Sequence, residues 1–194
     1  DNAVNGDWEE ITYTIGTDGV ARLWVVDNGG PINNKKIYEI IEPDPDAVTT
    51  VTAVNEYRWA YPSGSYNTEA AFMSKGYLVL VTKTSPSARM YRFETLTAGV
   101  TNKPTYIGKL MNSHSVSVAR QSADGKMLVT ASHEVVNLYR STDGTGSLKS
   151  VGGKFPECQM RAFPGEHVEA GEFVGAREMR FITEIKRTFL MRVD

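Results

Sequence analysis

Four β-rich units, repeated about every 50 residues, constrain the fold of this chain more than any other feature. Each unit contains a short apolar segment whose second position is a large side chain: Tyr38, Tyr91, Tyr139 and Met191. These positions are separated by 53, 48 and 52 residues. An internal period of this length in a β-rich chain is typical of the blades of a β-propeller.

The order of elements within each unit also repeats. A first strand, a tight turn and a second strand precede the apolar segment, with first strands predicted at 11–15, 70–73, 116–119 and 173–174. An outer strand is expected at 49–59, 105–110 and 148–151, and none in the last unit. This order predicts an all-β fold, a β-propeller of about four four-stranded blades in one domain spanning residues 1–194. A β-sandwich is the alternative, but it would not require the long period.

Composition excludes several classes of partner. The chain has 194 residues, of which 41% are hydrophobic, which is enough to build a core. Lys and Arg total 21 and Asp and Glu total 23, so no basic surface for nucleic acid or an anionic membrane is expected. No apolar run approaches the roughly 20 residues of a membrane span. Cys158, the single cysteine, excludes an internal disulfide framework and a multi-cysteine zinc site.

The predicted channel mouth carries the strongest candidate site. First strands line the central channel of a propeller, so the residues that precede them gather at one end. Glu9, Glu69 and Glu172 precede three of these strands, and His114 takes the fourth place. Converging carboxylates repel one another unless a proton or a cation lies between them.

Two interpretations of this acidic mouth stay open. The first is a divalent cation, Ca²⁺ or another, with four oxygen ligands from the sequence: Glu9, Asn67, Glu69 and Glu172. The second is a wet, polar channel whose acidic side chains are solvated or paired with Lys83 and Arg120.

A set of motifs resembles one known family. The motifs run in order along most of the chain: Asp7-Trp8-Glu9-Glu10-Ile11, Leu23–Gly29, Ile40-Ile41-Glu42-Pro43, Tyr61-Pro62, Asn67-Thr68-Glu69-Ala70 and Val81-Thr82-Lys83. This ordered set is similar to that of secreted six-bladed β-propellers, the YncE/esterase-like and strictosidine-synthase-type relatives. The resemblance implies a propeller and an extracellular location, and little about activity.

The chain departs from that family in two respects. Glu10 stands where the family has aspartate, and the family's G-D-x-G-D-N loop is reduced to 27–30. A six-bladed ring also needs more chain than four units. We therefore expect either a closed four-bladed ring or an arc that self-association or a partner chain completes.

The sequence contains no recognisable nucleophile and base pair. It has no G-x-S-x-G, P-loop or H-E-x-x-H motif. We therefore predict an extracellular binding or scaffold module with an unknown ligand, either a glycan, a matrix polymer or a small molecule. The alternative is a metal-dependent hydrolase of an ester, lactone or phosphoester at the channel mouth, with His114 as a candidate base. Whether the protein is an enzyme stays open.

Aromatic side chains are dense between the first two units. Tyr57, Trp59, Tyr61 and Tyr66 fall within ten residues of one another. They could form a surface on which sugars stack, and packing within or between blades explains them equally well.

Overall fold

The structure is a computed structural model that describes residues 2–28, 35–47, 50–133, 135–141, 148, 151–161 and 165–193. Within these residues the chain forms sixteen β-strands and no α-helix. The strands make four sheets that follow one another along the chain. We call these sheets blades one to four, and they confirm the all-β propeller that the repeat predicts.

Each blade is an antiparallel sheet built in chain order. Blade one contains β1 (Trp8–Ile15), β2 (Ala21–Asp27), β3 (Lys35–Ile41) and β4 (Asn55–Trp59). Blade two contains β5 (Thr68–Ser74), β6 (Tyr77–Thr82), β7 (Ser87–Arg92) and β9 (Thr105–Met111). Blade three contains β10 (Val118–Gln121), β11 (Met127–Ser132), β12 (Val135–Arg140) and β13 (Cys158–Arg161). Blade four contains β14 (Val168–Phe173), β15 (Glu178–Thr183) and β16 (Thr188–Arg192). The short β8 (Thr101–Asn102) joins the outer edge of blade one in parallel with β4.

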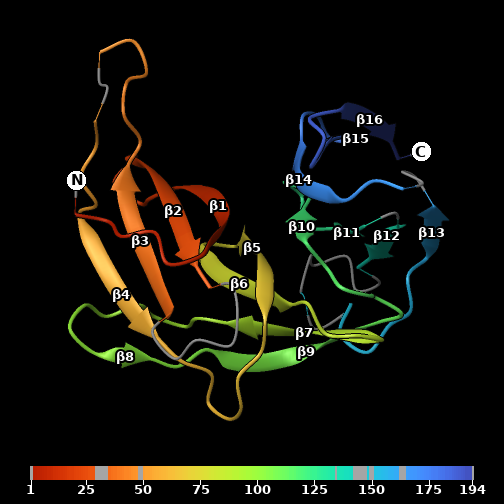
Figure 1. Cartoon of the computed structure of the whole chain (residues 1–194), viewed down its shortest axis with the longest axis horizontal. Helices are drawn as coiled ribbons and strands as arrows, with labels where there is room; N and C mark the ends of the chain where they lie inside the picture. Colours follow the sequence, from red (N-terminus) through yellow and green to blue (C-terminus); the bar gives the residue numbers. More distant parts are fainter. Residues whose placement is uncertain are drawn as a thin grey trace.

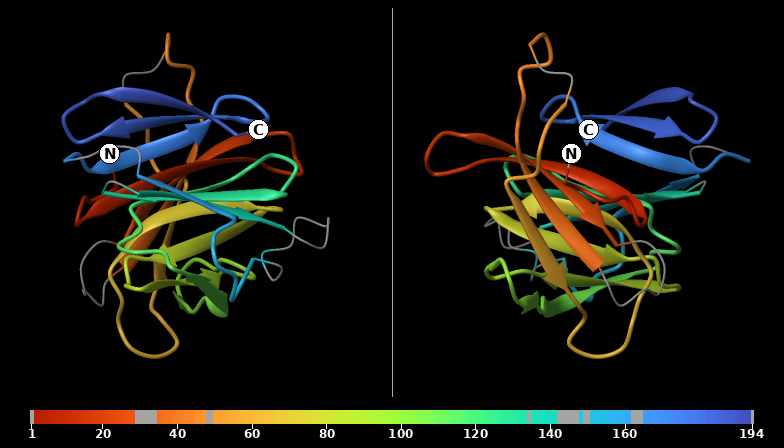
Figure 2. Two further views of the ribbon diagram at one scale, coloured as in Figure 1. Left: turned by 90° about the vertical axis from the view of Figure 1, so that its right-hand side faces the viewer. Right: turned by 60° about the vertical axis from the view of Figure 1, so that its left-hand side comes forward.

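The first strands of the blades lie next to one another around the centre. β1 packs beside β5, β5 beside β10, and β10 beside β14. The later strands of each blade extend outwards from this centre (Figure 1). In side view, blade four (blue) and blade two (yellow to green) lie on opposite sides of the molecule (Figure 2).

Two predicted strands are wrong in position. The outer strand of blade three is β13, whereas Leu148 and Val151 are buried outside any strand, and 149–150 lie outside the described residues. The first strand of blade four begins at Val168 and not at Phe173. Gly171 and two glutamates obscure the β pattern there. A Cβ on Gly171 would come within 2.9 Å of the Phe181 ring, so glycine allows β14 to pack closely against its neighbours.

Apolar clusters fill the three junctions between successive blades. Side chains alternate between the two faces of a strand. We call the face that packs on the next blade the leading face, and the face that packs on the preceding blade the trailing face. At the junction of blades two and three, Phe72 and Val81 on the leading face meet Leu128 and Tyr139 on the trailing face. The other two junctions have the same construction.

The apolar runs of the second strands place most of their large side chains in the core. Those with at most 3% exposure are Val26, Leu78, Leu80, Leu128 and Phe181. Trp24 is half-buried and packs against the cluster between blades one and two.

Arg120 connects all four blades at the centre. Its guanidinium donates to both carboxylate oxygens of Glu10 in blade one, at 2.7 and 2.8 Å. It also donates to the carbonyl oxygen of Ala71 in blade two at 2.9 Å and to Oε2 of Glu172 in blade four at 3.0 Å. Burial alone would lower the pKa of Arg120, but the hydrogen bonds and charge of Glu10 raise it above its ordinary value. The buried cation therefore stays charged and holds the inner strands together.

Leu80→Ala should lower the free energy of unfolding by about 2–5 kcal/mol, because Leu80 is fully buried between blades one and two. Denaturant unfolding measures the change. Tyr77→Ala, at the exposed start of the same strand, is the matched control and should cost far less. A loss below about 0.5 kcal/mol for Leu80→Ala would contradict this packing.

Arg120→Met should cost about 3–5 kcal/mol, because the Glu10 carboxylate would remain buried without its counter-charge. Arg120→Lys should recover little of this loss, since one ammonium group cannot replace the paired guanidinium contacts. The double variant Arg120→Met/Glu10→Gln should be more stable than Arg120→Met alone. Equal unfolding midpoints for all of these proteins would show that the central ion pair contributes nothing.

Candidate functional site

A β-bulge recurs in the first strands of blades one, two and four. In each case two residues of the first strand pair normally with the second strand and the residue between them is extra. The extra residue is a glutamate in all three blades: Glu9, Glu69 and Glu169. The strand register makes these three positions structurally equivalent. Because a bulge re-aims its side chain, we expect the three glutamates to point to one end of the channel.

Two more positions per blade belong to the same end of the channel. In three blades, the residue that follows the second strand donates a backbone N–H hydrogen bond to a backbone carbonyl oxygen. The residue that accepts it lies two positions before the bulge glutamate. The pairs are Asn28 with Asp7, Lys83 with Asn67, and Glu184 with His167. Blades one, two and four thus contribute one triplet of residues each. We call these three triplets together the channel mouth: Asp7, Glu9 and Asn28; Asn67, Glu69 and Lys83; His167, Glu169 and Glu184.

Local hydrogen bonds fix the approach of the chain to the first triplet. The carboxylate of Asp27, at the end of β2, accepts hydrogen bonds from the backbone N–H groups of Gly6 and Asp7 at 3.1 and 2.7 Å. This clamp holds the residues before β1 against β2. It therefore determines where Glu9 enters the mouth.

The glutamates of the mouth are close enough to affect one another. Burial, followed by the charges of Glu69 and Asp7, raises the pKa of Glu9 from 4.5 to about 7. Burial, followed by the charges of Glu69 and Glu184, also raises the pKa of Glu169. Lys83 forms a 2.6 Å ion pair with Glu69 and so offsets part of the negative charge of these glutamates.

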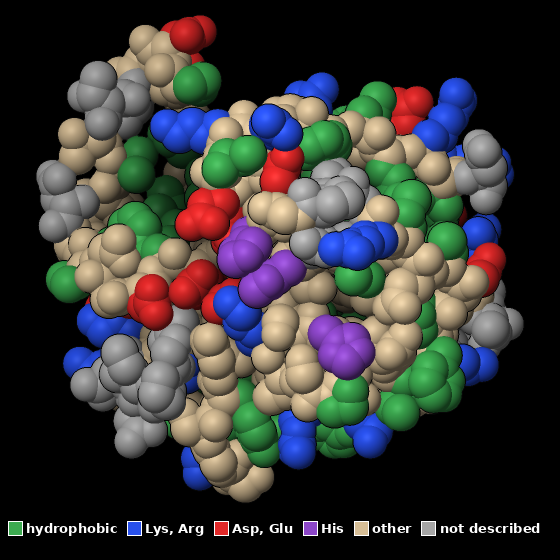
Figure 3. Space-filling view, turned by 45° about the vertical axis from the view of Figure 1, so that its right-hand side comes forward, with side chains coloured by type: hydrophobic (Ala, Val, Ile, Leu, Met, Phe, Trp, Pro, Cys, Tyr) green, Lys and Arg blue, Asp and Glu red, His purple; other side chains and the backbone are tan. Residues whose placement is uncertain are grey.

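Histidine joins the carboxylates at the blade-four side of the mouth. Nδ1 of His167 lies 3.6 Å from Oε2 of Glu184. One ligand atom from each of His167, Glu169 and Glu184 lies within 4.8 Å of the others, and all three side chains are exposed. The His167 ring stacks on His133 with 3.9 Å between ring centroids. Figure 3 shows two touching histidines beside acidic and basic side chains on this face.

The structure brings together three of the four predicted ligands. Glu9 and Glu69 interact electrostatically, and Asn67 donates to Glu69 Oε1 at 3.2 Å. Glu172 is bound by Arg120, and Glu169 takes the position equivalent to Glu9 and Glu69. The repeated pattern that identifies it is a polar residue, one intervening residue and glutamate: Asp7-Trp8-Glu9, Asn67-Thr68-Glu69 and His167-Val168-Glu169.

The expected place of His114 in the mouth is also corrected. His114 is exposed between β9 and β10, and the strand register assigns the blade-three position to Ser117. Ser117 is buried and donates to the carbonyl oxygen of Val168. His133, which follows β11 as Lys83 follows β6, is the blade-three residue next to His167. The role of His114 as a base stays a prediction.

The counter-charges predicted for the acidic residues are both engaged. Lys83 pairs with Glu69 in the mouth, whereas Arg120 pairs with Glu10 and Glu172 at the centre. Asn28 behaves differently from its equivalent Lys83. Its side chain is buried, and neither amide atom has a hydrogen-bond partner within the described structure.

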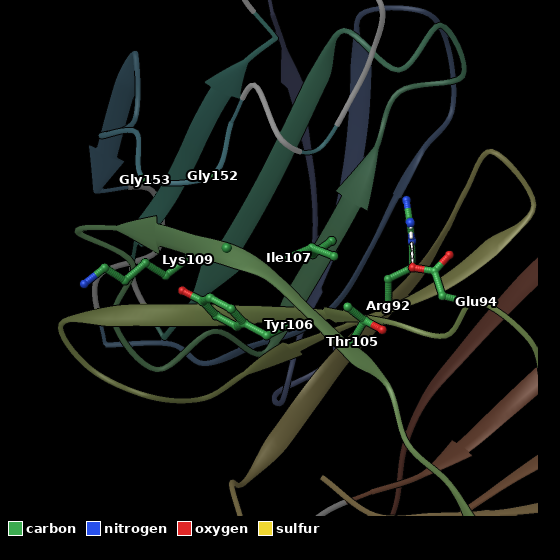
Figure 4. A pocket seen from close by; sticks show the side chains of 9 residues that line it. Arg92, Glu94, Thr105, Tyr106, Ile107, Lys109, Gly152 and Gly153 are labelled. Atoms are coloured by element: carbon green, nitrogen blue, oxygen red, sulfur yellow. Dashed lines mark hydrogen bonds and ion pairs between the residues drawn. The ribbon is translucent and has the colours of Figure 1, made fainter. Parts of the chain in front are cut away.

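Most of the predicted aromatic cluster is part of the core. Tyr57, Trp59 and Tyr61 are buried between blades one and two, so they cannot stack on a sugar. An exposed tyrosine, Tyr106 on β9, instead lines a groove of about 600 Å³ at the edge of blade two (Figure 4). Arg92 and Glu94 form a 2.6 Å ion pair at the same groove.

Comparisons with known proteins support the fold. No protein-family model and no curated protein matches the sequence. A crystal structure of Sqt1 from Chaetomium thermophilum superposes with a TM-score of 0.51 at 12% identity, covering 97% of this chain and 45% of that chain. The chain therefore spans less than half the length of Sqt1.

Two other solved propellers are less similar. They are the periplasmic gluconolactonase PpgL of Pseudomonas aeruginosa, with a TM-score of 0.49, and the WD40 β-propeller domain of Doa1, with 0.48. PpgL is 12% identical, and the match covers 95% of this chain and 56% of PpgL. The Doa1 domain is 11% identical, and the match covers 96% of this chain and 64% of that domain. The β-propeller class rests on the four sheets of the chain itself, and the similarity to Sqt1 extends no further than the fold. Within the part of the chain that the structure describes, no helix is long and apolar enough to cross a membrane.

Glu9→Gln should stabilise the protein more at pH 8 than at pH 5. The pKa of Glu9 is about 7 in the folded state, so the folded state binds more protons than the unfolded state between 4.5 and 7. The stability of the wild type therefore falls as the pH rises through 7. Glutamine removes this loss, which is on the order of 1 kcal/mol once solvent screening is considered.

Urea unfolding of both proteins in EDTA, at the two pH values, measures the difference. Glu178→Gln, which replaces a carboxylate outside the mouth, is the control and should follow the wild type. Identical pH dependence for the wild type and Glu9→Gln would contradict the raised pKa.

Proposed function

We propose that this propeller is a binding or scaffold module whose channel mouth holds a divalent cation. One observation carries the proposal: ligand atoms of His167, Glu169 and Glu184 lie within 4.8 Å of one another. Ligand atoms at about 2.1 Å from a shared ion are at most roughly 4.2 Å apart. A small closure of these exposed side chains would therefore complete a three-ligand site.

The charge of the surrounding mouth supports the same conclusion. Glu69 adds negative charge both to Glu9 and to Glu169 of the His167 site, and Lys83 offsets only part of it. A divalent cation would relieve the repulsion that raises the pKa values of Glu9 and Glu169. Glu9, Asn67 and Glu69 thus remain candidate ligands or outer contacts, and Glu169 replaces Glu172 in the predicted set.

The amide of Asn28 is a second, independent indication of a polar ligand. Buried amides in proteins are nearly always hydrogen-bonded, because an unsatisfied one costs about 1–3 kcal/mol. Among the described residues, neither atom of the Asn28 side-chain amide has a hydrogen-bond partner, and Asn28 occupies the mouth position equivalent to Lys83 and Glu184. A bound ion with its water, or the polar end of a ligand, would satisfy it.

The donor set favours particular ions. Carboxylate oxygens alone suit Ca²⁺ or Mg²⁺, as the sequence predicts. An imidazole nitrogen beside two carboxylates suits Mn²⁺ or Zn²⁺ better. With three protein ligands the remaining coordination positions stay open, so the ion would connect the propeller to an oxygen-bearing ligand such as a glycan or an acidic group. Secretion follows only from the family resemblance and is part of the proposal.

Calorimetric titration of chelator-treated protein with CaCl₂, MnCl₂ and ZnCl₂ tests the site. We expect one ion per chain, tighter binding of Mn²⁺ or Zn²⁺ than of Ca²⁺, and a higher melting temperature with the ion. Glu169→Gln should weaken binding about tenfold or more, the range seen when groups around a metal are removed. Glu172→Gln is the matched control on the same strand and should leave the affinity within about twofold.

Two results would refute the proposal. One is that no ion binds or raises the melting temperature. The other is that Glu172→Gln weakens binding as much as Glu169→Gln, which would show that the mouth does not hold the ion.

The hydrolase alternative depends on the same ion. An open coordination position could polarise an ester or phosphoryl oxygen and acidify water. Ion-dependent turnover of simple esters, lactones or phosphoesters that Glu169→Gln abolishes would favour it over the binding module.

A further inference from the structure

Within the part of the chain that the structure describes, two faces of the propeller have no neighbouring blade. Every junction inside the molecule pairs a leading face with a trailing face. The trailing face of blade one and the leading face of blade four are left over, at the two ends of the arrangement (Figure 1). Among the described residues, β1 and β14 do not pack together as the other neighbouring first strands do.

The free trailing face of blade one is apolar. Ile11 and Tyr13 on β1 are 52% and 46% exposed. Their equivalents in blade two, Ala71 and Met73, belong to the cluster packed against blade one. The N-terminal segment covers only the outer part of this face, where Ala3 contacts the cluster around Tyr38.

The free leading face of blade four presents exposed apolar side chains among charged ones. Ile182 and Leu190 are 44% and 62% exposed. Their equivalents in blade three, Ala131 and Leu138, are buried against blade four. Glu172 and Arg180 lie opposite each other in the register of this face, and the Glu172 carboxylate accepts its hydrogen bond from Arg120 at the centre.

We propose that two copies of this chain associate head to tail, with blade four of each copy packed on blade one of the other. The contact would be a leading face on a trailing face, the arrangement already present at all three internal junctions. Since each copy has one free face of each kind, a twofold axis along the channel would satisfy all four faces and close the ring.

The superposition on Sqt1 supports closure by two copies. Nearly the whole chain follows 45% of that propeller. Two copies would therefore supply close to the number of blades in a ring of that size. The exposed isoleucines and leucine would become buried, as their equivalents are within the chain.

Sedimentation velocity of the 194-residue chain over a range of concentrations tests the proposal. We expect a reversible dimer. Ile11→Glu and Ile182→Glu should each weaken self-association about tenfold or more, because each places a charge at the centre of a junction. Val100→Glu, at an exposed position in the segment before β8, is the matched control and should leave the dimer unchanged.

A mixture of the two variants distinguishes this contact from a symmetric one. A pair formed by Ile11→Glu and Ile182→Glu retains one intact junction, in which blade four of the first meets blade one of the second. The mixture should therefore dimerise more strongly than either variant alone. Equal weakness of the mixture would overturn the head-to-tail contact.

A folded monomer at every concentration would also overturn the proposal, and would favour blades from another polypeptide on these faces. So would assemblies larger than two copies. Far-ultraviolet circular dichroism of each variant establishes that it is folded. Cation binding in the mouth is measured separately, so failure of either proposal leaves the other intact.

Discussion

The Arg120 guanidinium is the contact on which the arrangement of the four blades depends. A buried cation must be compensated, and its compensation here comes from carboxylates of blades one and four and a carbonyl of blade two. Apolar packing at the junctions contributes more burial, but it is non-directional and acts between two blades at a time. The guanidinium fork requires partners at defined angles from all the inner strands at once. It therefore determines how the first strands approach one another, and with them the mouth that their bulges form.

The mouth arises from a repeated irregularity of the backbone. In a regular strand, neighbouring side chains alternate between the leading and trailing faces, and neither direction points along the channel. The bulge at Glu9, Glu69 and Glu169 adds one residue that belongs to neither face. Charged side chains can thus be placed at the mouth without disturbing the apolar junctions on either side. Burial, followed by the convergence of those charges, then raises the pKa values of Glu9 and Glu169.

The sequence predicts the blades well because the period and the turns are local signals. Asp124-Gly125 and the apolar runs around it need no tertiary information to be recognised as a hairpin. The site is predicted less well, because a one-residue bulge shifts every later position and leaves no compositional trace. Glu172 was therefore expected where Glu169 lies, since Gly171 weakened the strand pattern of β14. Arg120 is predicted as a counter-charge, but its pairing with Glu10 could not be foreseen, because these two residues are 110 positions apart in the chain.

Three consecutive residues of β1 show how one strand serves three surfaces. Glu9 is the bulge residue and faces the mouth, Glu10 binds Arg120 at the centre, and Ile11 lies on the free trailing face. In β14 the same three positions are Glu169 at the mouth, Ala170 on the free leading face and Gly171 in the junction with blade three. A substitution at one position therefore perturbs one surface, whereas a one-residue insertion or deletion would exchange all three. Because the first strands of blades one and four carry both the mouth and the free faces, closing the ring would bring further mouth carboxylates towards the same axis. The repulsion among them would grow, and the mouth would then need a cation more in the closed ring than in the single chain.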